Sequence, residues 1–234
     1  DHAVHLEEKG LGGKFLVALA DKHSYALLAN GDSPAKTLAD LKGKKIGITS
    51  AGSLTDTTIR YAIKELGLDP DKDFQIIAVG RAGAQRAALS AGVIDAGMFT
   101  TPDIQITMAE KGKFKIVDDF RKMPYPAQDI VITDTWLKAH PEEAAKIRRA
   151  IVKAIDMINA DKSVLVPAVK ALFPKLTDEA LINQIVDDVT SGYLSTDGVV
   201  TKDGFKNLIG VMTTANPKMK PVAYEAVVVS DLAK

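Results

Sequence analysis

The stretch KIGITSAGSLTDTTIRYAIKELG, from Lys45 to Gly67, decides the fold. Its first five residues, Lys45–Thr49, predict a buried strand, and the small residues of Ser50–Ser53 predict a loop. Apolar residues then recur at helical spacing, which predicts a helix over about Leu54–Leu66 that ends at a glycine. A strand that passes through a short loop directly into a helix is the repeating unit of an α/β sheet.

Strand and helix patterns also alternate on both sides of this stretch. The other expected strands are Lys14–Ala20, Tyr25–Ala29, Phe74–Val79, Ile94–Phe99, Phe114–Val117 and Asp129–Thr133. The other expected helices are Ser33–Leu41, Gly83–Ala91, Pro102–Lys111, Trp136–His140, Pro141–Ala160, Val164–Leu172, Asp178–Val189 and Asp203–Ala215. This order predicts a largely parallel sheet with helices on both faces in the middle of the chain, followed by a helix-rich part.

The difference between the middle and the end of the chain predicts two lobes. Residues 29–129 form a three-layer α/β lobe, and residues 1–28 plus 130–234 form a discontinuous, helix-rich lobe. The chain then crosses between the lobes twice, near Leu28–Gly31 and near Tyr125–Asp129. Two crossings of this kind predict a hinge with a cleft between the lobes.

Composition excludes several classes of protein. Of the 234 residues, 46% are hydrophobic and 26% are charged, which is the balance of a globular protein and not of a disordered one. Basic and acidic residues number 30 each, so no excess of positive charge indicates a nucleic-acid partner. The absence of cysteine excludes disulfides, thiol nucleophiles and cysteine-ligated metals. The N-terminal residues lack a signal-peptide pattern, so we expect a cytoplasmic protein or one whose leader has been removed.

Motifs for catalysis and metal binding are missing. The sequence contains no G-x-S-x-G, no phosphate-binding P-loop and no H-E-x-x-H. His2 and His5 lie at a terminus that we expect to be mobile, without a carboxylate at ligand spacing. The side chains of the acidic pairs Asp118-Asp119 and Asp187-Asp188 diverge on a strand or a helix, so neither pair forms an acid–base dyad. We therefore expect no cofactor, no metal and no enzyme activity.

The loop before the Leu54–Leu66 helix is the first candidate binding site. Five of its residues, Ser50, Gly52, Ser53, Leu54 and Thr55, surround a helix N-terminus, where unpaired backbone N–H groups and the helix dipole attract an anion. Serine and threonine hydroxyls would add donors. In open α/β sheets, ligands lie beyond the carboxyl ends of strands, which is the position of this loop. The alternative is that Ser53 or Thr55 only caps the helix.

Other candidates follow the next strands. Arg81 offers a planar fork to an anion, although an arginine is more commonly a solvated surface residue. Thr100 and Thr101 have hydroxyls after the strand Ile94–Phe99, although Thr101 can equally cap the following helix. The last three candidates lie near the expected crossings, where a packed or solvent-exposed loop is the alternative: Tyr125, Gln128 and His23.

Three motifs resemble a known family. They are the strand entry DLKGKKIG at 40–47, the helix-to-strand junction AALSAGVIDAG at 87–97 and the W-L-x-x-x-P-E opening that begins at Trp136. All three are similar to the substrate-binding proteins of sulfonate, taurine and nitrate importers, including the relatives that bind thiamine-pyrimidine precursors. These have the type II periplasmic-binding-protein fold. The similarity runs from about Lys14 over most of the chain.

The resemblance implies a solute receptor for an ATP-driven importer. Such a receptor would be exported, periplasmic or extracellular, and membrane-associated. It would bind a small anionic solute such as a sulfonate, nitrate or a carboxylate and present it to a membrane permease. We expect a monomer. The family pattern begins with further strand–helix units before this sequence starts, so we expect the first lobe to lack its leading strands. The alternative is an enzyme on the same fold, of the kind that acts in menaquinone or pyrimidine biosynthesis. The pyrimidine type is disfavoured because its Cys-rich motif has no counterpart here.

Overall fold

The computed structural model describes residues 1–229, which fold into two compact units. Unit 1 comprises Asp1–His23, Met123–Thr213 and the chain from Lys218. Unit 2 comprises Ser24–Lys122 and Thr214–Pro217. The boundaries thus fall a few residues earlier than the sequence patterns place them.

Unit 2 is built on a five-stranded sheet in the order β4-β3-β5-β2-β6. The strands are β2 (Tyr25–Asn30), β3 (Lys45–Ile48), β4 (Gln75–Ala78), β5 (Ala96–Thr100) and β6 (Phe114–Asp119). β3 pairs with β4 and with β5 in parallel, whereas β2 runs antiparallel to both of its neighbours, β5 and β6. Four strands therefore share one direction, and the expected largely parallel sheet contains one reversed strand.

The reversed strand corrects the predicted domain division at one point. The sequence patterns assign residues 25–28 to the lobe formed by residues 1–28 and 130–234, but β2 lies inside the sheet of unit 2. Its burial explains this position: Leu27 belongs to the apolar cluster on one face of the sheet and Leu28 to the cluster on the other. A strand that is apolar on both sides needs neighbours on both edges and helices on both faces.

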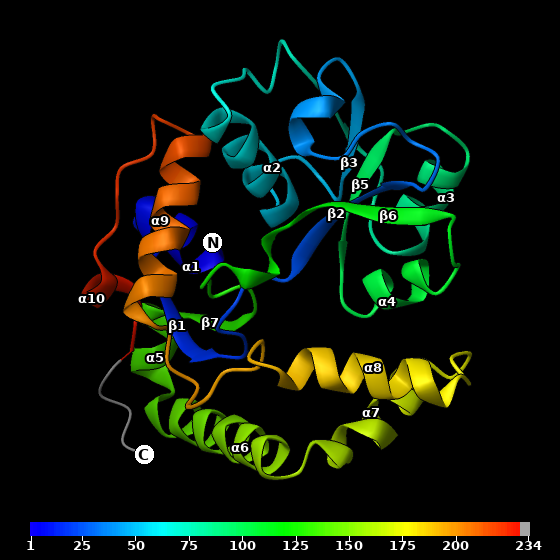
Figure 1. Cartoon of the computed structure of the whole chain (residues 1–234). Coiled ribbons are helices and arrows are strands. Elements are labelled where there is room, and N and C mark those ends of the chain that lie inside the picture. Colours follow the sequence, from blue (N-terminus) through cyan, green and yellow to red (C-terminus); the bar gives the residue numbers. More distant parts are fainter. Residues whose placement is uncertain (230–234) are drawn as a thin grey trace. The chain divides into compact units, whose positions relative to one another are not determined.

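Helices cover both faces of this sheet (Figure 1). α2 (Leu54–Glu65) packs through Ile59 and Ile63 on one face, together with the 3₁₀ turn Leu38–Leu41 that replaces the longer helix expected from Ser33. α3 (Gly83–Ser90) and α4 (Asp103–Met108) contribute Leu89 and Ile104 to the core on the other face. This is the predicted three-layer arrangement.

Unit 1 combines a two-stranded antiparallel sheet with helices. β1 (Gly13–Ala18) pairs with β7 (Asp129–Thr133), and Leu16 and Val17 pack against Ala144 and Ile155 of α6. The remaining helices are α5 (Asp134–Ala139), α6 (Pro141–Ala160), α7 (Leu165–Leu172), α8 (Glu179–Thr190), α9 (Lys202–Ala215) and α10 (Tyr224–Val227). None of the helices within residues 1–229 is long and apolar enough to span a membrane.

The N-terminal residues are ordered, contrary to the expected mobile terminus. They form α1 (His2–Glu8), which packs on β1. Ala3 and Val4 are completely buried on its inner side. The sequence pattern did not reveal this helix because it is short and has only two apolar residues facing the core.

Candidate functional site

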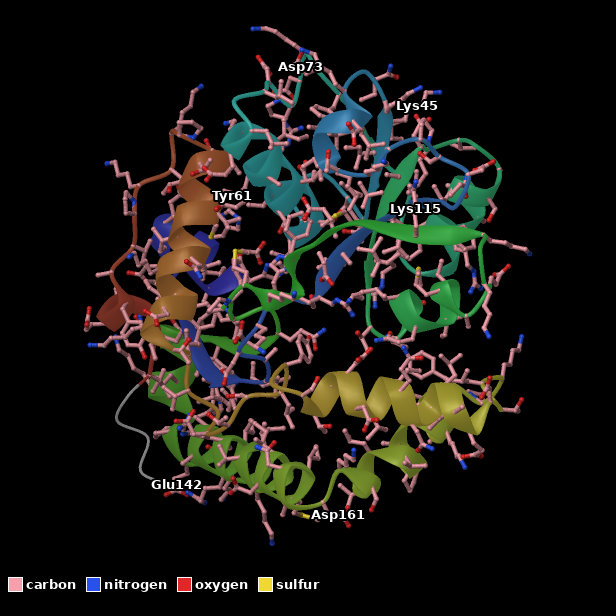
Figure 2. All side chains as sticks on the ribbon, viewed as in Figure 1. Lys45, Tyr61, Asp73, Lys115, Glu142 and Asp161 are labelled. Atoms are coloured by element: carbon pink, nitrogen blue, oxygen red, sulfur yellow. The ribbon has the colours of Figure 1, made fainter. Side chains whose placement is uncertain are left out.

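The carboxyl ends of three neighbouring strands gather the predicted residues of unit 2 at one edge of its sheet. The loop 50–55 follows β3, Arg81 follows β4, and Thr101 follows β5, in which Thr100 is the last residue. Since the strand order is β4-β3-β5 and the three run in parallel, all of these residues lie at the same edge. Lys45 begins β3 at the opposite edge, where its backbone N–H donates to Asp95 Oδ2 at 2.8 Å (Figure 2).

The N-terminus of α2 presents donors at this edge. Ser53 is the N-cap residue, but its side chain makes no capping hydrogen bond to the helix. Within the described residues, the backbone N–H groups of Leu54, Thr55 and Asp56 meet no acceptor, and the first bonded one is that of Thr57, which donates to Ser53 O at 2.9 Å. Three orphan donors at the positive end of a helix dipole form an environment that favours an oxyanion.

The hydroxyl groups of the loop are bonded mainly to one another. Thr49 donates from its backbone N–H to Thr55 Oγ1 at 2.9 Å and from its hydroxyl to Ser53 Oγ at 2.8 Å. Ser53 Oγ in turn lies 2.8 Å from Thr55 Oγ1 and donates to the carbonyl of Ser50 at 2.7 Å. Thr55 is completely buried. Thr55 therefore braces the loop, and Ser53 has the one hydroxyl proton that could turn from Ser50 to a ligand.

The carboxylate of Asp56 already balances part of the positive charge at the N-terminus of α2. Asp56 is buried, accepts from the backbone N–H of Gly52 at 2.8 Å and accepts from Arg60 Nε at 2.7 Å. Arg60 also donates to Asp71 at 2.8 Å. Asp56 ties the loop to the helix and complements the dipole, while its own charge is neutralised by Arg60. Gly52 is thus committed to the loop, whereas Leu54 still presents a free N–H.

Arg81 is exposed and brings positive charge to the edge. Burial raises the pKa of Tyr25, at the start of β2, and the nearby Arg81 guanidinium opposes that rise. Burial likewise raises the pKa of Asp103, at the start of α4, against the opposing charges of Arg86 and Arg81. Tyr25 faces Thr100 in the β2–β5 register, so Arg81 acts on groups across the sheet edge.

Thr101 does not cap α4, because Pro102 holds the N-cap position. Its hydroxyl instead accepts a hydrogen bond from Gln105 Nε2 at 3.1 Å. Three members of this edge were not predicted from the sequence: Gln105, Thr49 and Asp103. Their position in the sequence could have indicated them, because each lies close to the end of a predicted strand.

The three remaining candidates belong to unit 1. His23 and Tyr125 are both completely buried, and their rings meet edge to face with centroids 5.0 Å apart. The prediction of a solvent-exposed loop histidine, offered as the alternative for His23, is therefore wrong. Gln128 is exposed, and its backbone carbonyl accepts from Leu19 and Ala20.

Buried polar atoms surround Tyr125 within unit 1. The Tyr125 hydroxyl, Asp21 Oδ1 and Asp129 Oδ1 are buried without a hydrogen-bond partner among the described residues. Burial raises the pKa of Asp129 to about 7; the amino group of Asp1 opposes this rise, and the carboxylate of Asp21 adds to it. Burial around Tyr125 therefore disfavours the charged forms of these groups.

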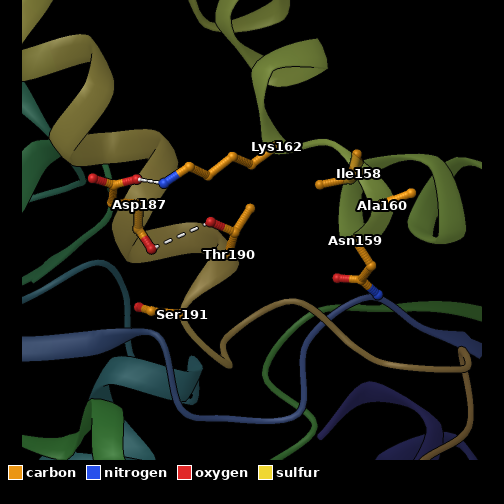
Figure 3. A pocket seen from close by; sticks show the side chains of 7 residues that line it. All are labelled: Ile158, Asn159, Ala160, Lys162, Asp187, Thr190 and Ser191. Atoms are coloured by element: carbon orange, nitrogen blue, oxygen red, sulfur yellow. Dashed lines mark hydrogen bonds and ion pairs between the residues drawn. The ribbon is translucent and has the colours of Figure 1, made fainter.

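A pocket of about 570 Å³ opens elsewhere in unit 1, between the ends of α6 and α8 (Figure 3). Lys162 and Asp187 form an ion pair at 2.5 Å there, and both side chains are more than half exposed. The hydroxyl of Thr190 donates to the carbonyl of Val186 at 2.8 Å, and Asn159 Nδ2 donates to Ser195 O at 3.3 Å. Because its polar groups are bonded to their own unit, this pocket is a weaker candidate than the sheet edge. Nor do the described residues include a cluster of histidine and acidic side chains suited to a metal ion.

Solved structures share the fold of this chain at low sequence identity. A protein from Bordetella bronchiseptica RB50 matches with a TM-score of 0.80 and 23% identity, over 99% of this chain and 76% of that one. The alkanesulfonate-binding protein SsuA from Xanthomonas axonopodis pv. citri, bound to MOPS, matches with a TM-score of 0.75 and 15% identity, over 97% and 77%. The desulfurization enzyme DSZB matches with a TM-score of 0.59 and 14% identity, over 95% and 78%. These likenesses confirm the α/β periplasmic-binding-protein fold.

Sequence comparison adds the family. No curated protein matches the chain in sequence. The family model described as NMT1/THI5 like, by contrast, matches residues 1–162, which is more than half of the chain and includes the whole of the candidate sheet edge. The chain therefore belongs to the NMT1/THI5-like family.

Proposed function

We propose that this protein is the solute-binding receptor of an ATP-driven importer and that the carboxyl edge of the unit 2 sheet binds an oxyanion group of the solute. The single observation that carries the proposal is the set of three backbone N–H groups, at Leu54, Thr55 and Asp56, that meet no acceptor among the described residues. Arg81 adds an exposed positive charge at the same edge. The shared fold of the alkanesulfonate-binding protein described above supports the same class of ligand.

This proposal includes a location and a partner. A receptor of this class works outside the cytoplasmic membrane and delivers its solute to a membrane permease, so we propose a periplasmic or extracellular location. The oxyanion that the edge would hold is a sulfonate, nitrate or a carboxylate, because each offers oxygens that accept from N–H groups and from a guanidinium. The protein would act as a monomer.

Thermal unfolding against a ligand panel tests the proposal. The panel contains taurine, ethanesulfonate, nitrate, bicarbonate, dicarboxylates and thiamine-type pyrimidines. A ligand at about 100 times its Kd stabilises the folded state by about 2.7 kcal/mol, which raises Tm by roughly 5–10 °C in a protein of this size. A saturable shift with one oxyanion is expected, and no shift with any member would contradict the proposal.

Two arginine variants locate the binding site. Arg81→Ala should weaken binding of the active oxyanion about tenfold or more, because a charge-assisted hydrogen bond contributes about 1.5–3 kcal/mol. Arg149→Ala is the matched control, because it also removes an exposed arginine but lies in unit 1 rather than unit 2. It should leave the Kd unchanged. Equal effects of the two variants would show that the sheet edge is not the site.

The alternative function is an enzyme on the same fold. Its support is the likeness to a desulfurization enzyme, which shows that this fold also accommodates catalysis. Incubating each organic panel member with the protein and following it by proton NMR, with ion chromatography for nitrate, separates the two functions. A receptor returns every ligand unchanged, whereas turnover of any member would favour the enzyme.

A further inference from the structure

Gln105 limits what the Thr101 hydroxyl can do. Gln105 lies on α4 with only 2% of its surface exposed, and its Nε2 donates to Thr101 Oγ1 at 3.1 Å. The hydroxyl oxygen of Thr101 therefore accepts a hydrogen bond from inside the unit, while its own proton remains for another partner. No acceptor for that proton is found among residues 1–229.

The neighbouring strand shows a related arrangement. Ser53 Oγ, after β3, accepts from the Thr49 hydroxyl at 2.8 Å and donates its own proton to the carbonyl of Ser50 at 2.7 Å, so that proton reaches a ligand only when it turns away from Ser50. β3 and β5 are adjacent in the sheet. The hydroxyls at the ends of these two strands thus both accept a hydrogen bond from within the unit, and a chain of hydrogen bonds strengthens its last donor. Of the two, the Thr101 proton is the one that meets no acceptor among residues 1–229.

We propose that Gln105 is a positioning residue that holds Thr101 as a hydrogen-bond donor toward the solute. This inference rests on the proposed function and narrows its ligand class. An oxygen that only accepts, as in a sulfonate or an ionised carboxylate, is favoured at Thr101. A group that presents only protons there, such as an ammonium, would have to use the one remaining lone pair of Thr101 Oγ1 and would leave the Thr101 proton without an acceptor, so it is disfavoured.

The variant Gln105→Glu tests this role because it preserves the shape of the side chain and reverses the direction of its hydrogen bond with Thr101. A carboxylate only accepts, so it would take the Thr101 proton and turn that hydroxyl away from the ligand. When the introduced carboxyl is protonated, its O–H can donate to Thr101 Oγ1 and restore the original direction. Burial raises the pKa of such a carboxyl, which brings this titration into an accessible pH range.

The measurement is the Kd of ethanesulfonate by titration calorimetry at pH 5 and pH 8. Ethanesulfonate stays ionised at both values, so any pH dependence comes from the protein. The wild type should bind equally at the two pH values. Gln105→Glu should bind about tenfold or more weakly at pH 8, a cost expected for one lost hydrogen bond to a charged group, and within about threefold of wild type at pH 5.

Matched variants separate positioning from damage to the fold. Thr101→Val removes the hydroxyl with little change of shape, and it should weaken binding at both pH values. In the double variant Gln105→Glu/Thr101→Val the pH dependence of binding should disappear, because the hydroxyl through which Gln105 acts is gone. Thermal unfolding of each variant at both pH values checks that the fold is retained.

Three results would overturn the inference while leaving the receptor function intact. If Gln105→Glu binds within twofold of wild type at both pH values, the amide oxygen rather than the N–H faces Thr101. If the loss is the same at pH 5 and pH 8, Gln105 has only a structural role. If the pH dependence persists in the double variant, Gln105 does not act through the Thr101 hydroxyl. A wild-type protein that binds no oxyanion of the panel refutes the proposed function itself, and the inference with it.

Discussion

The side-chain oxygen Oε1 of Gln85 lies 2.5 Å from the position that a Cβ atom on Gly97 would occupy. A Cβ on Gly47 would stand 2.9 Å from the same oxygen. The two glycines are register partners in the parallel β3–β5 pair, so together they leave the space into which α3 inserts its glutamine. Within the described residues neither amide atom of Gln85 has a hydrogen-bond partner, and the side chain is completely buried.

Gly97→Ala should therefore destabilise the protein. The added methyl group meets a side chain in a packed core, and overpacking of this kind costs about 1–3 kcal/mol. Equilibrium urea unfolding measures the change. Gly210→Ala is the control, because a Cβ there meets nothing within 4 Å and lies in the middle of α9. This control should gain about 0.5–1 kcal/mol from the better helix propensity of alanine.

A double variant attributes the cost to Gln85. If the clash with its amide is the cause, Gly97→Ala should cost much less in a Gln85→Ala background than in the wild type. An unchanged cost in that background would show that the methyl group is resisted by other neighbours, such as Ile94 or Phe99.

The two acids that bind Arg60 should differ sharply in their contribution to stability. Asp56 is buried and also accepts from the backbone of Gly52, whereas the side chain of Asp71 is 74% exposed. Asp56→Ala should lower the free energy of unfolding by about 1.5–3 kcal/mol, since it leaves a backbone donor and a guanidinium without their carboxylate. Asp71→Ala should cost no more than about 1 kcal/mol, as expected for a surface ion pair.

Chemical denaturation of both variants in low and high salt checks this difference. Salt should reduce the small effect of Asp71→Ala and change the effect of Asp56→Ala little, because only exposed pairs are strongly screened. Similar losses for the two variants would mean that Asp56 does not anchor the 50–55 loop.

Local patterns were enough to predict the elements that surround the sheet edge. The strand Lys45–Ile48 and the helix Leu54–Glu65 agree with the sequence prediction to within a residue, because apolar spacing and a glycine stop mark their ends. By contrast, the place of β2 between β5 and β6 depends on pairing over long distances in sequence, which periodicity does not encode. The hydrogen bonds of Gln105 and Thr49 could not be predicted for the same reason, because the sequence pattern does not show which hydroxyl each side chain contacts.

Asp129 should make stability fall as the pH rises. Burial raises its pKa to about 7 in the folded state from an ordinary 3.8, with the Asp1 amino group opposing this rise and Asp21 adding to it. The folded protein therefore retains a proton that the unfolded chain loses between about pH 4 and pH 7, and each pH unit in that window costs up to about 1.4 kcal/mol. Asp129→Asn should remove this decline, as measured by urea unfolding at pH 4 to 8.

Asp161 supplies a control, because its contribution to stability changes with pH in the opposite direction. The Ser163 hydroxyl and the Ser163 backbone N–H, the latter at 2.9 Å, donate to its carboxylate and lower its pKa. Figure 2 labels Asp161. The stability that it contributes is present above its ordinary pKa and is lost as the pH falls, so Asp161→Asn should matter least in acid. If Asp129→Asn follows the wild-type pH profile throughout, the carboxyl of Asp129 is ionised in the folded protein.

The protein should be more stable with glycine than with alanine at position 82. Its backbone has φ 51° and ψ −119°, a conformation that side chains rarely adopt, at the N-cap of α3 beside Arg81. Relief of this strain should raise the free energy of unfolding by about 1 kcal/mol in Ala82→Gly. Ala84→Gly, in the first turn of the same helix, should instead cost about 0.5–1 kcal/mol because its backbone is already helical. Urea unfolding of the two variants tests this. If both lose stability alike, the backbone at Ala82 is not strained. If Ala82→Gly gains stability while Ala84→Gly loses it, the turn that places Arg81 at the sheet edge is held at the expense of stability.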